Sequence, residues 1–96
     1  MEEKKDIEWF NRSIAPDLKN FEIKYRFFAE GDFGALNQIE FNSKLVGGNI
    51  DFCGLGWLGI FVRDYKNEKI MLNILLEPQQ EKEKTEAFEK LNRLLK

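Results

Sequence analysis

Residues 47–65 read GGNIDFCGLGWLGIFVRDY, and the structure of this stretch determines which class of fold the chain can have. Its centre, Gly54 to Gly59, has the spacing G-x-G-x-x-G that cradles a pyrophosphate in dinucleotide-binding proteins. That chemistry needs a strand before the glycines and a helix N-terminus after them. The residues after Gly59 are Ile60, Phe61 and Val62, which favour a strand. We therefore predict a β-hairpin with 54–56 as a three-residue loop, and no nucleotide site.

The strand after this loop is apolar on both faces. Side chains alternate along a strand, so they fall into two sets, with Leu58, Ile60 and Val62 on one face and Trp57, Phe61 and Tyr65 on the other. Two apolar faces indicate either a central strand or a strand with a binding surface on one side.

The same alternation predicts further strands on both sides of the hairpin, at 21–27, 36–43, 50–53 and 70–76. We expect a bulge between Leu36 and Ile39, where the alternation changes phase. Gly47 and Gly48 predict a turn over Val46–Asn49, and Lys66–Glu68 predicts another.

Helical spacing appears only at the two ends of the chain. Ile7, Phe10 and Ile14 share one helix face, and Pro16 should end that helix at about Ala15. The residues after Pro78 form a second amphipathic pattern. Short links between strands give antiparallel hairpins. The chain is therefore predicted to be one α+β domain over residues 1–96, an antiparallel meander of four to five strands with both helices packed on one face.

Composition excludes several kinds of function. The chain has 96 residues, a net charge of −2, one cysteine and no histidine. A small acidic domain is not expected to bind nucleic acid directly, and without histidine we expect no Ser-His or Cys-His nucleophile pair, no cofactor and no metal site. Cys53 is predicted to be a structural thiol. We expect a cytoplasmic protein that does not enter membranes, because no secretory signal and no long apolar run is seen.

Two groups of residues are candidates for binding a partner. The carboxylates are Glu30, Asp32, Glu40, Asp51 and Asp64, and the aromatic residues are Phe33, Trp57, Phe61 and Tyr65. By alternation, Glu40 and Asp51 fall on the wet face of one hairpin. Acids that face each other there need a cation, either Lys24 or Arg26 of the same sheet or a basic partner.

Each group has a plainer interpretation as well. The carboxylates fit a solvated sheet face, an acidic recognition surface or, least well, a catalytic pair. The aromatic residues fit either an exposed interface or a core packed under the N-terminal helix with Trp9.

The hairpin GGNIDFCGLGWLGIFVRDY, followed by MLNILLEPQQ and an amphipathic helix, resembles small bacterial immunity proteins of toxin systems, including contact-dependent growth inhibition. The resemblance covers about Gly31 to Gln80. It implies a non-enzymatic cytosolic inhibitor that plugs the active site of a cognate toxin domain. Toxin nucleases are usually basic, so acidic residues would be the expected contacts. The alternative hypothesis is a homodimeric scaffold or regulator, since five strands with partly apolar faces can pair edge to edge or face to face.

Overall fold

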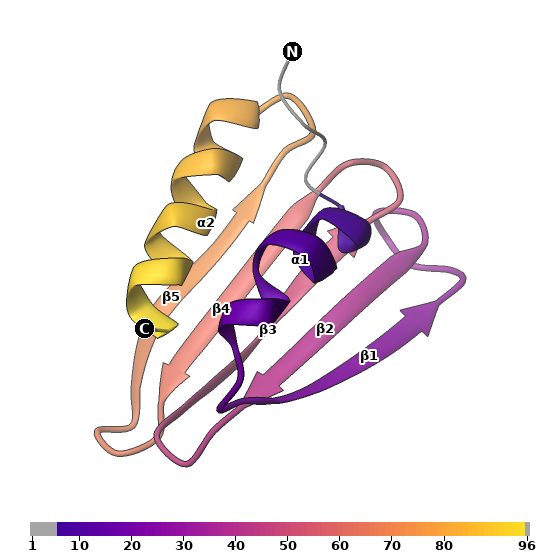
Figure 1. Ribbon diagram of the computed structural model, residues 1–96. Coiled ribbons are helices and arrows are strands. Elements are labelled where there is room, and N and C mark those ends of the chain that lie inside the picture. The colour runs from indigo at the N-terminus through magenta and orange to yellow at the C-terminus, as the bar shows by residue number, and fades with distance from the viewer. Residues whose placement is uncertain (1–5, 96) are drawn as a thin grey trace.

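The computed structural model describes residues 6–95, which form one antiparallel sheet with two helices on the same face (Figure 1). The strands are β1 (Glu22–Phe28), β2 (Leu36–Asn42), β3 (Val46–Cys53), β4 (Leu58–Asp64) and β5 (Lys69–Leu76). Helix α1 (Ile7–Ser13) runs into a single 3₁₀ turn, η1 (Ala15–Asp17), and helix α2 (Glu81–Leu95) follows the last strand. The strands lie in the sheet in the order β1-β2-β3-β4-β5, so the predicted α+β meander is confirmed.

Local sequence explains where α1 starts and stops. The carboxylate of Asp6 caps the helix by accepting a 2.9 Å hydrogen bond from the backbone N–H of Trp9. Pro16 then allows only the short 3₁₀ turn, because its ring cannot continue the helical hydrogen bonds. A helix of seven residues is too short to be stable alone, so α1 depends on what it packs against.

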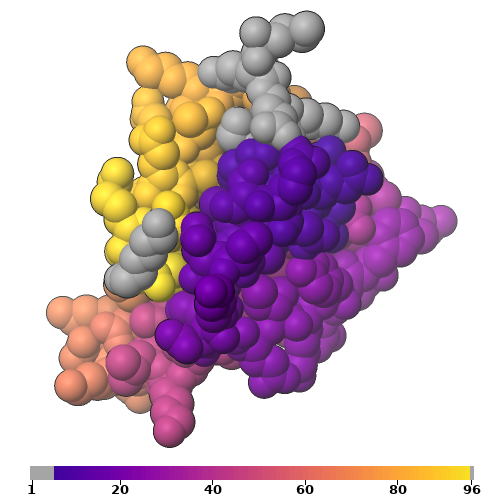
Figure 2. Space-filling model, in the orientation of Figure 1, coloured from indigo at the N-terminus to yellow at the C-terminus, as the bar shows by residue number. Residues whose placement is uncertain are grey.

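The hydrophobic core lies between the helices and one face of the sheet. Space-filling atoms of α1 and α2 cover the middle of the sheet from this side (Figure 2). The rings of Trp9 and Phe88 meet edge to face at 4.6 Å and so join the two helices. Core residues of the sheet are Ile39, Phe41, Ile50, Phe52, Leu58, Ile60, Val62 and Leu72. The helices add Trp9, Phe10, Ala87, Phe88 and Leu91.

The glycine-rich stretch forms the predicted hairpin loop. The backbone N–H of Cys53 donates to the carbonyl of Trp57 at 3.0 Å, and that of Gly56 donates to the carbonyl of Cys53 at 2.9 Å. Gly56 has a φ of 97°, a conformation that glycine adopts at little cost. Strand β4 follows directly, so the phosphate-binding spacing lacks the helix that its function needs.

Two local predictions are wrong. The segment Val46–Asn49 is the start of β3 rather than a turn. The turn instead uses Ser43, whose backbone N–H donates to the carbonyl of Val46 at 2.9 Å and whose hydroxyl accepts from the N–H of Val46 at 3.1 Å. The two glycines of β3 allow neighbouring groups to approach the strand closely. A Cβ at Gly47 would overlap the Tyr65 hydroxyl, and one at Gly48 would overlap the carbonyl oxygen of Phe61.

The expected bulge in β2 is also absent from the described sheet. β2 pairs without a break with both β1 and β3, and Leu36 simply faces the side opposite Ile39. The irregularity lies between Val62 and Arg63, where β4 meets β5. The change of phase in the sequence therefore reflects one apolar residue on the solvent side, not an inserted residue.

Candidate functional site: the open face of the sheet

The sheet face opposite the helices carries the candidate site, and we refer to it as the open face. Its side chains alternate with the buried core residues along each strand. The strand register gives its polar and aromatic members, which are Glu22, Lys24, Arg26, Phe28, Gln38, Glu40, Asn42, Asn49, Asp51, Phe61, Arg63 and Asn73.

Two carboxylates at the centre of the open face are held in place by neighbouring strands. Asp51 accepts hydrogen bonds from the side-chain amides of Gln38 at 2.9 Å and Asn49 at 3.1 Å. Glu40 pairs with the guanidinium of Arg26 at 3.1 Å. The register places Asn49 opposite Glu40 and Gln38 opposite Asp51, so the two acids are diagonal neighbours. Of the two cations that the sequence offered, Arg26 pairs with Glu40, but it does not join the two acids, because Asp51 is held by amide groups instead.

Two of the aromatic candidates, Phe61 and Tyr65, lie along the same side, which contradicts the interpretation that they pack under α1. Phe61 alternates with the buried Ile60 and Val62 and therefore faces away from the helices. The Tyr65 hydroxyl donates to the side-chain oxygen of Asn42, so its ring crosses the start of β3. Their faces are set by strand alternation, and α1 packs on the other side of the sheet.

A second aromatic contact lies at the end of the sheet where the β3–β4 turn is found. The rings of Phe33 and Trp57 are 4.5 Å apart, with 32° between their planes. Phe33 belongs to the loop between β1 and β2, so this pair joins two turns. Both side chains are only half-buried, which leaves part of each ring available for contact.

A shallow polar dish of about 280 Å³ is set into the open face. Gly47 and Gly48 line it where the absence of side chains leaves room, while Phe61 and Tyr65 supply aromatic surface. Its polar side chains are Glu40, Asn42, Asn49 and Arg63. Sequence analysis missed Asn42 and Arg63, although both alternate in phase with the residues it did select. Asn49 was missed because it was assigned to a turn.

The remaining predicted acids lie apart from this group. Glu30 and Asp32 are exposed in the β1–β2 loop. Asp64 accepts hydrogen bonds from the backbone of Lys66 at 3.0 Å and from the side chain of Asn67 at 2.8 Å. The hydrogen bonds from Asn67 are the main reason that the pKa of Asp64 is lowered. Asp64 thus shapes the β4–β5 turn.

The open face is mixed in charge rather than uniformly acidic. Its carboxylates are Glu22, Glu40 and Asp51, and its cations are Lys24, Arg26 and Arg63. A surface with charges of one sign mainly steers the approach of a partner. A surface with both signs can also fix the position in which the partner docks, so this mixture suits recognition of a pattern of charges.

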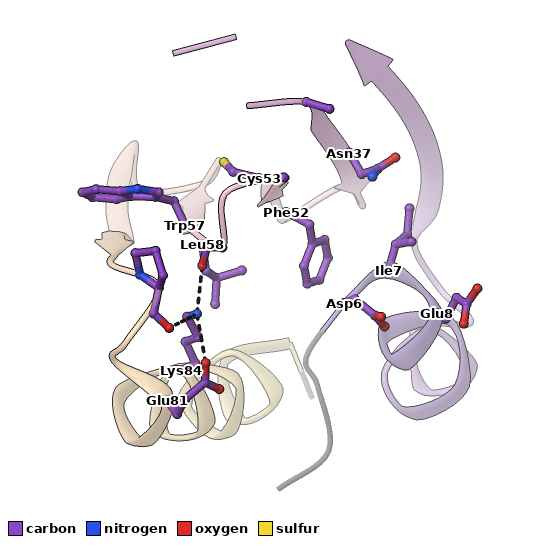
Figure 3. Close-up of a pocket in the computed structure, with 14 residues that line it drawn as sticks. Asp6, Ile7, Glu8, Asn37, Phe52, Cys53, Trp57, Leu58, Glu81 and Lys84 are labelled. Carbon is purple, nitrogen blue, oxygen red and sulfur yellow. Dashed lines mark hydrogen bonds and ion pairs between the residues drawn. The ribbon is translucent and has the colours of Figure 1, made fainter. Parts of the chain in front are cut away.

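A deeper hollow of about 430 Å³ lies between the starts of the two helices and the β3–β4 turn (Figure 3). Lys84 projects into it from α2, and its amine donates to the carbonyl oxygens of Gly56 at 2.8 Å and Pro78 at 3.1 Å. Glu81 lies 3.4 Å from the same amine. Because Lys84 is committed to these internal acceptors, its role in this hollow is structural.

The thiol of Cys53 is the one sulfur nucleophile of the sequence. Burial, and secondarily the charge of Asp51, raises the pKa of the Cys53 thiol, which keeps it protonated and poorly nucleophilic. Over residues 6–95 no three Cys, Asp or Glu side chains come together in a way that could hold a metal ion. Neither α1 nor α2 has the length and apolar character needed to cross a membrane.

Comparison of the chain with protein-family models, curated proteins and solved structures gave no match.

Proposed function

We propose that this chain is a non-enzymatic, cytoplasmic immunity protein that neutralises a cognate toxin domain by occluding its active site. The observation that carries the proposal is the uncovered sheet face, where Glu40, Asp51, Phe61 and Tyr65 stand together. Aromatic residues surrounded by charged side chains are typical of protein interfaces.

The network around the two central acids supports a binding role. Gln38 and Asn49 hold the Asp51 carboxylate in one position, so little side-chain entropy is lost when a partner contacts it. Glu40 already accepts a guanidinium, that of Arg26, at 3.1 Å. An arginine or lysine beside a toxin active site would meet the same kind of acceptor. A basic nuclease domain is therefore the kind of toxin that we propose as partner.

Phe61 is the proposed apolar anchor of this interface. It lies at the edge of the polar dish and is half-buried by its own sheet, so a partner can remove the rest of its surface from water. Carboxylates around such an anchor would steer the encounter and would make the association rate depend on salt. Occlusion requires no reacting group on this chain.

The test is a double charge reversal, Glu40→Lys with Asp51→Lys, in a tagged protein expressed in its native cells. We expect the unaltered protein to retain one stoichiometric partner with a toxin-like domain, identified by mass spectrometry. With that purified partner, the double variant should bind at least about tenfold more weakly while its melting temperature stays nearly the same.

The matched control reverses two charges on the exposed side of α2, Lys82→Glu with Glu86→Lys, and should bind normally. Equal losses of binding and stability in the sheet variant would make Glu40 and Asp51 structural residues and would contradict the proposal. Recovery of the protein alone, with no partner, would favour a self-associating scaffold instead.

A further inference from the structure

Strand β1 forms one edge of the sheet, and most of its side chains are exposed to solvent. Ile23 is half-buried and the other residues of the strand are exposed. Three of the exposed residues are aromatic, with exposures of 51% for Tyr25, 63% for Phe27 and 46% for Phe28. At the opposite edge, α2 lies along β5 (Figure 1). Exposed edges normally carry a proline, a bulge or a covering element, because unpaired N–H and C=O groups pair readily with another strand.

Charged side chains also protect edges, and of all these protections β1 has only its charged residues Glu22, Lys24 and Arg26. The strand holds no proline, and its register with β2 is unbroken from Glu22 to Phe28. Side chains of this part of the chain stand at the surface beside α1 (Figure 2). The strand is also well ordered for pairing, since the Tyr25 hydroxyl donates a 2.7 Å hydrogen bond to Asn11 of α1. An edge with an unbroken register and exposed aromatic side chains is suited to accept one more strand.

We infer that β1 pairs antiparallel with β1 of a second copy of this chain, so that two sheets become one. A two-fold axis perpendicular to the sheet makes each contact occur twice. The same axis keeps the helix-covered faces of both sheets on one side. Residues directly opposite each other then point to the same face, so a single residue, and not the bond between two residues, must lie on the axis. The choice of that residue fixes which side chains face each other.

Charge and apolar contacts together select the centre. With Ile23 on the axis, Glu22 would lie opposite a lysine, Lys24 of the second copy, which is favourable, but Phe27 would lie opposite Lys19 rather than an apolar residue.

If Tyr25 were on the axis, Lys24 would lie opposite Arg26 of the second copy, twice, and like charges directly opposite are unfavourable. If Lys24 is on the axis, Glu22 lies opposite Arg26 of the second copy, twice, which is favourable. The single Lys24 pair at the axis is flanked by Glu22, which lies 3.7 Å from Lys24 in the same strand.

The apolar side of the strand fits the same register. With Lys24 on the axis, Ile23 lies opposite Tyr25 of the second copy, and Phe21 lies opposite Phe27. Aromatic and β-branched pairs of this kind are among the stabilising cross-strand contacts. The exposed rings of Tyr25 and Phe27 thus gain partners at the same register that pairs the charges. This dimer uses the edge of the sheet and leaves Glu40, Asp51, Phe61 and Tyr65 free, so it does not depend on the proposed function.

The first test is sedimentation equilibrium of the purified full chain over a wide range of concentration. We expect a reversible monomer–dimer equilibrium. Arg26→Glu places an acid opposite Glu22 and should weaken the dimer about tenfold or more, while Glu22→Arg combined with Arg26→Glu should restore it. Glu40→Gln removes the same intrachain ion pair of Arg26 without touching the edge, and should leave the dimer intact.

The second test fixes the register by disulfide trapping in a Cys53→Ala background. Only the residue on the axis meets its own copy, and residues opposite each other in an antiparallel pair are close enough for a disulfide. Lys24→Cys should therefore cross-link on oxidation, and Tyr25→Cys should not. A monomer at every concentration, a dimer unaffected by Arg26→Glu, or cross-linking of Tyr25→Cys in place of Lys24→Cys would each overturn the inference.

Discussion

The amine of Lys84 in α2 donates a 2.8 Å hydrogen bond to the carbonyl oxygen of Gly56 in the β3–β4 turn. The same amine reaches the carbonyl oxygen of Pro78 at 3.1 Å, and the Lys84 residue is only 7% exposed. A buried ammonium group is tolerated only when acceptors replace its water. This side chain therefore ties the start of α2 to the end of the sheet.

Replacing Lys84 by methionine should destabilise the protein. Methionine keeps the apolar stem but leaves the carbonyl groups of Gly56 and Pro78 without this donor, so the free energy of unfolding should fall by about 1–3 kcal/mol. Urea denaturation measures the change. The exposed Lys82→Met is the control and should change stability by less than about 0.5 kcal/mol. Equal effects of the two substitutions would show that these hydrogen bonds add nothing.

Two glycines of the central hairpin should respond differently to alanine. A Cβ at Gly48 would overlap the backbone carbonyl of Phe61, which cannot move without shifting β4, so Gly48→Ala should cost about 1–3 kcal/mol. A Cβ at Gly59 would make only an ordinary 3.5 Å contact with the Cβ of Asp51. Gly59→Ala should therefore be neutral or stabilise by up to about 1 kcal/mol. Thermal denaturation of both variants checks this order, and the reverse order would contradict the close strand approach at Gly48.

The contact between the helices should control the stability of α1. Phe88 is buried against Trp9 and also stacks with Phe52 at 6.2 Å. Phe88→Ala should cost about 3–5 kcal/mol, because it leaves a cavity where three elements meet. Leu45→Ala, in the exposed β2–β3 turn, is the matched apolar control and should cost far less. Tryptophan fluorescence during unfolding would report the loss.

Asp64 should make stability depend on acid pH. Its pKa is lowered in the folded protein, chiefly by hydrogen bonds from Asn67, so the folded state favours the charged form. The stabilisation is present above the ordinary pKa of 3.8 and is lost as the pH falls through the lower folded value. Wild type should therefore be more stable than Asp64→Ala at neutral pH, and the gap should close in acid. A gap that stays constant down to the acid transition would contradict this role.

Strand alternation predicted most of the fold, and the errors have identifiable causes. Apolar residues at every second position gave the strands and their buried faces, since burial of one face imposes that period. The turn predicted at Val46–Asn49 followed from the preference of paired glycines for turns. In the structure those glycines serve close contacts with Tyr65 and Phe61, which lie in sequence far from them. Single-sequence patterns do not contain such contacts.

The candidate site was predictable only in part for the same reason. Parity placed Glu40 and Asp51 on one face of their hairpin, and the strand register confirms that placement. The side on which Phe61 lies was left open by the sequence, and the structure puts it on the same face as the two acids. The partners of the acids depend on the register between strands, which the turns set. Because the start of β3 was misplaced, the hydrogen bond from Asn49 to Asp51 could not be anticipated.

The order of the strands also has a consequence for synthesis of the chain. Each strand of the sheet pairs with the one made just before it, so the sheet can grow hairpin by hairpin as the polypeptide leaves the ribosome. Helix α2 is the last described element to emerge, and Phe52 and Leu58 stay without its cover until then. We therefore expect the nascent chain to pass through a stage at which the sheet is complete but its apolar face is only partly covered. Chaperones that bind exposed strands would engage the chain at that stage.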